Sequence, residues 1–125
     1  MLPRTGYDRH YVASCRESVG AAVEELRRVG AGSVAWNQLV VALEHWFAQR
    51  VPKVEGRDGN PLNEVRAIAD SVTEHGAVMT VPKGIRLRPE TSVLGFDEGE
   101  EITLDGDAFE RLFDAFLAEV EEKYC

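Results

Sequence analysis

The sequence has few cysteines and no long apolar run. Cys15 sits within a helical apolar pattern and Cys125 is the last residue, so the two suggest neither a disulfide framework nor a paired-cysteine zinc site. The apolar run Leu39–Leu43 is five residues long, whereas a membrane-spanning helix needs about 20. The polar first ten residues do not have the pattern of a secretory signal. We therefore expect a cytoplasmic setting without membrane association.

Familiar catalytic signatures are also missing. There is no Gly-x-Ser-x-Gly, P-loop or dinucleotide fingerprint, and the residues 30–32, Gly-Ala-Gly, follow a predicted helix where a phosphate-binding turn would follow a strand. His10, His45 and His75 lie on different predicted elements and form no metal-ligand pair. Cys15 lies in an apolar seam, and burial makes a thiol inert. We expect no cofactor, and the balance is against an enzyme.

Bases are scarce in the second half of the chain. The net charge is −8, with eight bases and seven acids in residues 1–62 but six bases and fifteen acids in residues 63–125. Such an acidic half repels phosphate backbones, so we expect no general nucleic-acid binding.

Acidic residues cluster at 97–110, a stretch without a base. Oxygen-rich clusters can bind divalent cations, which leaves a metal-dependent hydrolase as one functional alternative. The spacing does not match an EF-hand loop, and a solvated turn beside a helix N-terminus explains the same residues. We assign no metal site.

The final stretch has the strongest pattern in the chain. Its apolar residues recur at the spacing of one helical face, and Asp105 is placed to cap the helix, with Leu104 and Phe109 forming a hydrophobic staple. This predicts a helix over 105–124 that is the centre of the core. The stripe consists of Phe109, Leu112, Phe113, Phe116, Leu117, Val120 and Tyr124.

Three further helices are predicted, from an N-cap at Thr5 to about Val29, from about Val34 to Gln49, and from an N-cap at Asn60 to His75. In the first, residues 12, 15, 19, 22, 26 and 29 form a heptad seam. Short alternating segments predict strands at 78–81, 85–88 and 101–104, and residues 92–96 form either a strand or an ordered loop. We predict one domain, residues 1–125, of class α+β. About four helices surround a small antiparallel sheet of two to four short strands, inserted between the third and last helix.

A basic strip at 83–88 is the best candidate for a ligand site. Arg86 and Arg88 alternate with apolar residues, and their guanidinium groups could bind a carboxylate or phosphate together with Asn63 and Arg66. Lys83 and Asn60 belong to the same candidate set. The alternative is cross-strand pairing of Arg86 or Arg88 with Glu101.

The second helix has more apolar residues than one buried stripe needs. Residues 36, 39, 40, 43 and 47 fill that stripe, and Val41 and Trp46 lie off it. We predict an interface at Val41, His45 and Trp46, most simply a homodimer. In the alternative, the first and third helices bury both sides of the second within one chain.

Sequence alone does not determine the function. The leading hypothesis is a small non-catalytic interaction or regulatory module that binds a protein partner or a second copy of itself. An anion or phosphorylated-ligand binder that uses Arg86 and Arg88 is the alternative, followed by the metal-dependent hydrolase.

Overall fold

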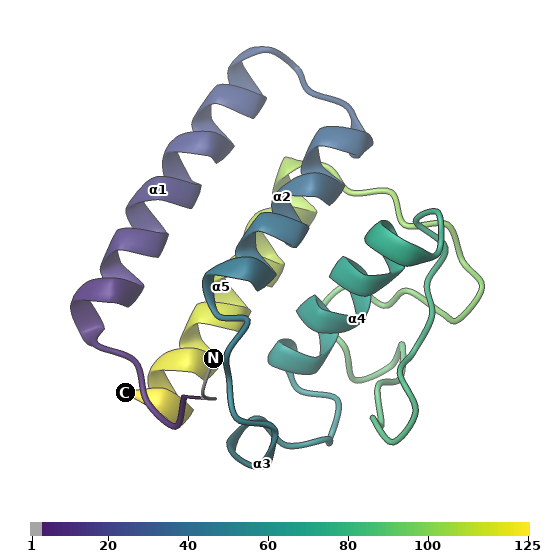
Figure 1. The fold of residues 1–125 in the computed structure, drawn as a ribbon. Coiled ribbons are helices and arrows are strands. Elements are labelled where there is room, and N and C mark those ends of the chain that lie inside the picture. The colour runs from purple at the N-terminus through teal and green to yellow at the C-terminus, as the bar shows by residue number, and fades with distance from the viewer. Residues whose placement is uncertain (1–3) are drawn as a thin grey trace.

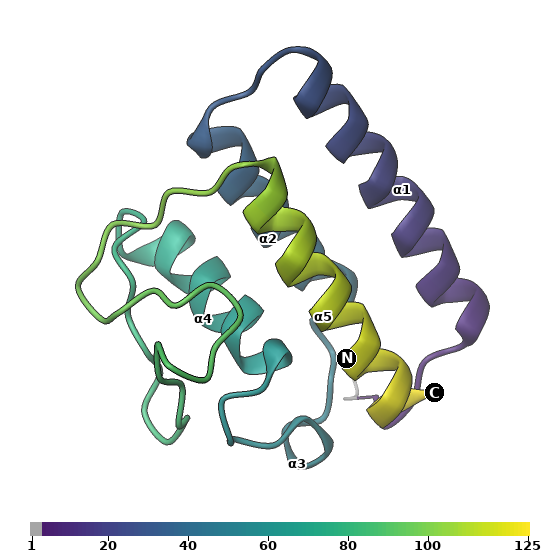
Figure 2. The ribbon, with the colours of Figure 1, turned by 180° about the vertical axis from the view of Figure 1, so that it is seen from behind.

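The computed structural model describes residues 4–125, and within them it contains five helices and no strand. In chain order these are α1 (Arg9–Arg28), α2 (Ser33–Trp46), α3 (Pro52–Glu55), α4 (Pro61–Glu74) and α5 (Gly106–Tyr124). Helices α2 and α5 lie against each other, with α1 on one side and α4 on the other (Figure 1), and the reverse view shows α5 in front (Figure 2). The α+β prediction is therefore wrong.

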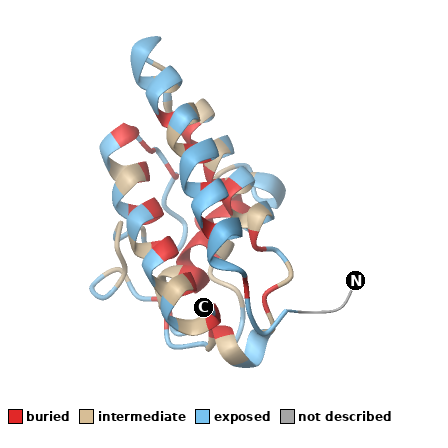
Figure 3. Ribbon diagram, turned by 90° about the vertical axis from the view of Figure 1, so that its left-hand side faces the viewer, coloured by how far each residue is buried: buried red, intermediate tan, exposed pale blue. Residues whose placement is uncertain are grey.

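Helix α5 forms the centre of the core, as its sequence pattern predicts. All seven residues of its apolar stripe are buried, and buried positions from the other helices face it (Figure 3). The carboxylate of Asp105 accepts a hydrogen bond from the Ala108 N–H at 2.8 Å, which confirms the predicted N-cap. Leu104 and Phe109 are both buried at this end, where the staple was expected.

The other long helices follow their patterns with local differences. Asn60 caps α4 by accepting from the Leu62 and Asn63 N–H groups at 2.9 and 3.2 Å, as predicted. In α2, four of the five residues predicted for the core stripe are buried, and Leu39 is half-buried. The α1 seam is only partly right, because Val23 is buried in place of Ala22 and Val29 is 74% exposed.

The predicted N-cap of α1 is wrong, because the helix begins at Arg9 and Asp8 caps it through the His10 N–H at 2.7 Å. Residues before Asp8 are hydrogen bonded to other parts of the chain. The Arg4 N–H donates to the Gln49 carbonyl at 2.6 Å, and the Tyr7 N–H donates to the Tyr124 carbonyl at 2.8 Å. These bonds hold the N-terminal segment across the ends of α2 and α5, so it cannot join the helix.

The predicted sheet is replaced by an ordered irregular segment between α4 and α5. One antiparallel bridge, Val78 to Glu101, is present, but the ladder does not extend. Met79 still donates to the Glu100 carbonyl at 2.8 Å, but the two N–H groups after it bind side chains. Thr80 donates to Ser71 Oγ at 2.9 Å and Val81 donates to Glu98 Oε1 at 3.0 Å. Residues 92–96 form the ordered-loop alternative and not a strand. Alternation predicted the half-buried character of these segments but not their hydrogen-bond partners.

Substitution of the central aromatic residues should test the role of α5. Phe116→Ala and Phe113→Ala remove side chains that are 0% and 5% exposed, and each should lower the free energy of unfolding by about 3–5 kcal/mol. Urea denaturation followed by circular dichroism measures the loss. Asp114→Ala, at an exposed position of the same helix, is the matched control and should change stability by less than about 0.5 kcal/mol. Near wild-type stability of either Phe variant would refute the central role of α5.

Candidate functional site

A buried ionic network joins α2, α3 and α4. The side chain of Arg50 is fully buried, and its guanidinium lies 3.0 Å from Glu55 Oε1 and 3.0 Å from Glu44 Oε1. It also donates to the carbonyls of Phe47 and Leu62 at 3.1 and 3.4 Å. Its Cζ atom lies 5.4 Å from the centre of the Phe116 ring. A fully buried cation needs such partners, because an unpaired buried charge is strongly destabilising.

Two residues predicted to bind a ligand belong to this network. Arg66 donates to both carboxylate oxygens of Glu55, at 2.6 and 3.2 Å, in a bidentate pair. Asn63 donates to Glu55 Oε2 at 2.8 Å and to the Gly56 carbonyl at 3.0 Å, and it accepts from the Gly59 N–H at 3.0 Å. Their side chains are thus already used within the protein. Both bind the carboxylate of Glu55, a residue that the sequence analysis did not single out.

The network also changes acid strengths. Burial raises the pKa of Glu55, but hydrogen bonds and positive charge from Arg66 and Arg50 outweigh it, so the pKa lies below its usual value. At Glu44 burial dominates and the pKa is raised, because the two arginines only partly offset it. The hydrogen bond to Glu55 raises the pKa of Arg66 further. One carboxyl pKa lowered and one raised, around two guanidinium groups, describe a structural salt-bridge network.

Arg86 and Arg88 are exposed, whereas Asn63 is buried and both Asn63 and Arg66 are engaged with Glu55. The Arg86 N–H donates to the Arg57 carbonyl at 2.9 Å, and the backbone there passes so close to Gly59 that a Cβ at that position would collide with the Arg86 carbonyl. No ion pair joins Arg86 or Arg88 to Glu101 within residues 4–125. The predicted cross-strand pairing is wrong because Glu101 lies opposite Val78.

The acidic residues at 97–110 are mostly occupied by local structure. Asp107 and Glu110 bind Arg27 at 2.9 and 3.0 Å, while Glu98 and Asp105 accept backbone N–H groups. In the described part of the chain, no group of three or more acidic, His or Cys side chains is arranged to hold a metal ion.

Glu64 is a second buried acid that the sequence pattern did not single out. Its carboxylate accepts from the Val93 and Leu94 N–H groups at 2.8 and 2.9 Å, 29 and 30 residues along the chain. Burial raises its pKa, and the two hydrogen bonds partly offset this. Glu64 therefore fixes the irregular segment onto α4, which is a structural role.

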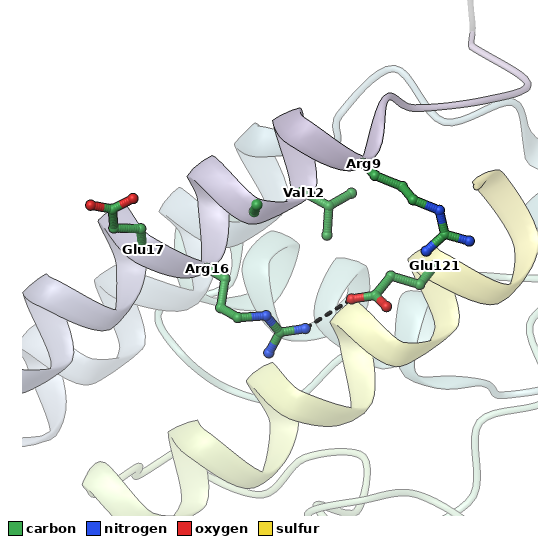
Figure 4. A pocket seen from close by; sticks show the side chains of 6 residues that line it. Arg9, Val12, Arg16, Glu17 and Glu121 are labelled. Carbon is green, nitrogen blue, oxygen red and sulfur yellow. Dashed lines mark hydrogen bonds and ion pairs between the residues drawn. The ribbon is translucent and has the colours of Figure 1, made fainter.

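Cys15 does not have the properties of a nucleophile. It is fully buried in α1, and burial raises the pKa of its thiol to about 12. A shallow hollow of about 300 Å³ lies between α1 and α5, and Val12, Arg16 and Glu121 are among its lining residues (Figure 4). The Arg16–Glu121 ion pair, at 2.9 Å, bridges it and leaves Arg16 engaged.

The predicted interface residues line a larger hollow of about 850 Å³. We call it the Trp46 hollow; it lies between the N-terminal part of α1 and the C-terminal part of α2. The Tyr11 hydroxyl donates to the Trp46 carbonyl, and the two ring centres lie 5.3 Å apart. Its lining residues are Arg4, Tyr7, Tyr11, Gln38, Val41, Ala42, His45, Trp46, Ala48 and Gln49.

A second hollow of about 340 Å³ continues along the same two helices. We call it the Leu26 hollow, and it shares Gln38 and Ala42 with the Trp46 hollow. Its other lining residues are Ala22, Glu25, Leu26, Ala35 and Leu39. The two hollows form one groove along the outward side of α2, hereafter the α1–α2 groove. Sequence reasoning found the α2 side of this groove through its surplus apolar residues but missed Tyr11 and Arg4.

Comparison with known proteins identifies no relative, since no family model, curated protein or solved structure matches this chain. None of the described helices is long and apolar enough to cross a membrane.

Removing the central acid of the network, Glu55, should lower the free energy of unfolding. Glu55→Gln leaves the buried Arg50 guanidinium without a full counter-charge and should destabilise the protein by about 3–5 kcal/mol. The control is Glu121→Gln, which removes the exposed Arg16 pair and should change stability by less than about 1 kcal/mol. Urea titration at pH 7 compares the two, and equal effects would contradict a structural role for the network.

The effect of Glu55→Gln should depend on pH. Because the folded pKa of Glu55 is lowered, its stabilisation is fully present above the unfolded pKa of about 4.3 and is lost as pH falls through the folded value. The difference in unfolding free energy between wild type and variant should therefore be largest near pH 7 and shrink below about pH 4. Urea titrations between pH 3 and pH 7 measure it, and a constant difference would rule out this linkage.

Proposed function

We propose that this chain is a small non-catalytic interaction module that self-associates through the outward face of α2. One observation carries the proposal, namely that this face has no Asp, Glu, Lys or Arg although the chain has a net charge of −8. The only acid of α2, Glu44, is directed to Arg50 and Arg66 in the buried network. Two acidic copies repel each other least where they meet at such a face.

The shape of the face supports the same proposal. Val41 and Trp46 are half-buried, whereas Ala42 and His45 are exposed, so an apolar and partly open surface remains after the chain has folded. Trp46 is partly covered by Tyr11 within its own chain, which accounts for some of the surplus apolar area. The groove beside it is open, and grooves with aromatic walls are common at the centres of interfaces.

The proposal includes a reducing, cytoplasmic setting. Both cysteines are free, with Cys15 buried and Cys125 exposed, which suits a compartment where thiols remain reduced. The anion-binding alternative stays a prediction resting on Arg86 and Arg88 alone, because Asn63 and Arg66 are engaged with Glu55. No observation in the described residues favours the hydrolase.

A charge placed in the middle of the groove should separate the copies. Ala42 is exposed and lines both hollows, so Ala42→Glu should weaken the dimer at least tenfold while the monomer keeps its fold. Ala118→Glu, at an exposed position of α5, is the matched control and should leave the dimer intact. Sedimentation velocity between about 1 and 100 μM spans the relevant affinities. A wild-type protein that stays monomeric throughout would refute self-association.

A further inference from the structure

The α1–α2 groove has ends of opposite charge. The Trp46 hollow is lined by Arg4 and His45 and by no carboxylate, whereas Glu25 is the one charged residue lining the Leu26 hollow. Arg4 lies at the C-terminal end of α2, because its backbone is hydrogen bonded to Gln49 and Val51. Glu25 lies beside the N-terminal part of α2, since α1 and α2 run in opposite directions (Figure 1).

Neither charge is engaged by an opposite charge within residues 4–125. The Arg4 guanidinium lies 5.7 Å from the centre of the Tyr7 ring, and no salt bridge in the described residues includes Arg4 or Glu25. This contrasts with Arg27, two residues after Glu25, which binds both Asp107 and Glu110. The groove therefore has one available cation and one available anion, separated along α2.

We propose that two copies of this chain pack with their α2 helices antiparallel about a twofold axis near Gln38 and Ala42, so that Arg4 of each copy meets Glu25 of the other. This register rests on the proposed self-association and adds its geometry. A twofold axis across the helices reverses the groove, which places the Trp46 hollow of one copy on the Leu26 hollow of its partner. A parallel arrangement would bring like charges together at both ends and is disfavoured.

The outward residues of α2 suit such a packing. Ala35, Gln38, Ala42 and His45 follow one another at a spacing of three, four and three residues, which is the seam of a paired helix. Two of them are alanines, and small residues let two helices approach to about 8–10 Å between axes. Gln38 and Ala42, common to both hollows, lie at the middle of this seam, where the twofold axis would pass.

Charge reversal tests the register without changing the core. Arg4→Glu and Glu25→Arg each place two pairs of like charges in the dimer, so each variant alone should dimerise at least tenfold more weakly than wild type. A one-to-one mixture restores both opposite pairs, and the heterodimer should bind within about threefold of wild type. Native mass spectrometry separates the heterodimer from both homodimers by mass, and circular dichroism melts check that each variant is folded.

Two control variants carry the same changes outside the groove. Arg9→Glu and Glu24→Arg alter residues that line neither hollow, and they should dimerise like wild type both alone and when mixed. If the groove variants dimerise like wild type, or if their mixture gives no heterodimer, the antiparallel register is overturned while self-association stands. A monomeric wild type overturns both, and the response to Ala42→Glu shows whether the groove is used in another register.

Discussion

The buried guanidinium of Arg50 is the constraint on which the arrangement of the helices depends. A fully buried cation must be surrounded by acceptors, and here Glu44 comes from α2, Glu55 from α3 and a carbonyl from Leu62 at the start of α4. The guanidinium also lies over Phe116 of α5. One charge thus fixes the position of four elements around the aromatic centre of the core. The short helix α3 places Glu55 against this charge.

The 31 residues between α4 and α5 show how side chains can replace a sheet. Irregular segments of this length are uncommon in compact domains, because their backbone groups need partners. Here Ser71 and Glu64, both buried in α4, accept N–H groups from residues 80, 93 and 94. The apolar residues Met79, Leu87 and Ile102 are buried beneath. The segment is therefore held by polar contacts to α4, by Asn37 of α2, which donates to the Ile102 carbonyl at 2.9 Å, and by its own buried residues. It covers α4 without forming a ladder.

Charged side chains are distributed differently in the interior and on the candidate interface. Glu44 and Glu55 are paired with Arg50 and Arg66 in the interior, and the outward side of α2 has no Asp, Glu, Lys or Arg. A chain of net charge −8 needs such a neutral face if it is to meet a second copy. The aromatic contact between Tyr11 and Trp46 provides one wall of the groove. These features are the basis of the proposed self-association.

Sequence alone determined the elements that depend on local periodicity and capping. The α5 stripe, the caps Asn60 and Asp105, and the surplus apolar side of α2 can all be read from neighbouring residues, because helix geometry repeats every 3.6 residues. Tertiary structure alone decided which distant groups became partners. Alternation at 78–104 could not show that Ser71 and Glu64 would take the strand donors, nor could spacing show that Glu55 would engage Asn63 and Arg66. Which groups become partners depends on which of them are buried together, and burial is a property of the assembled core.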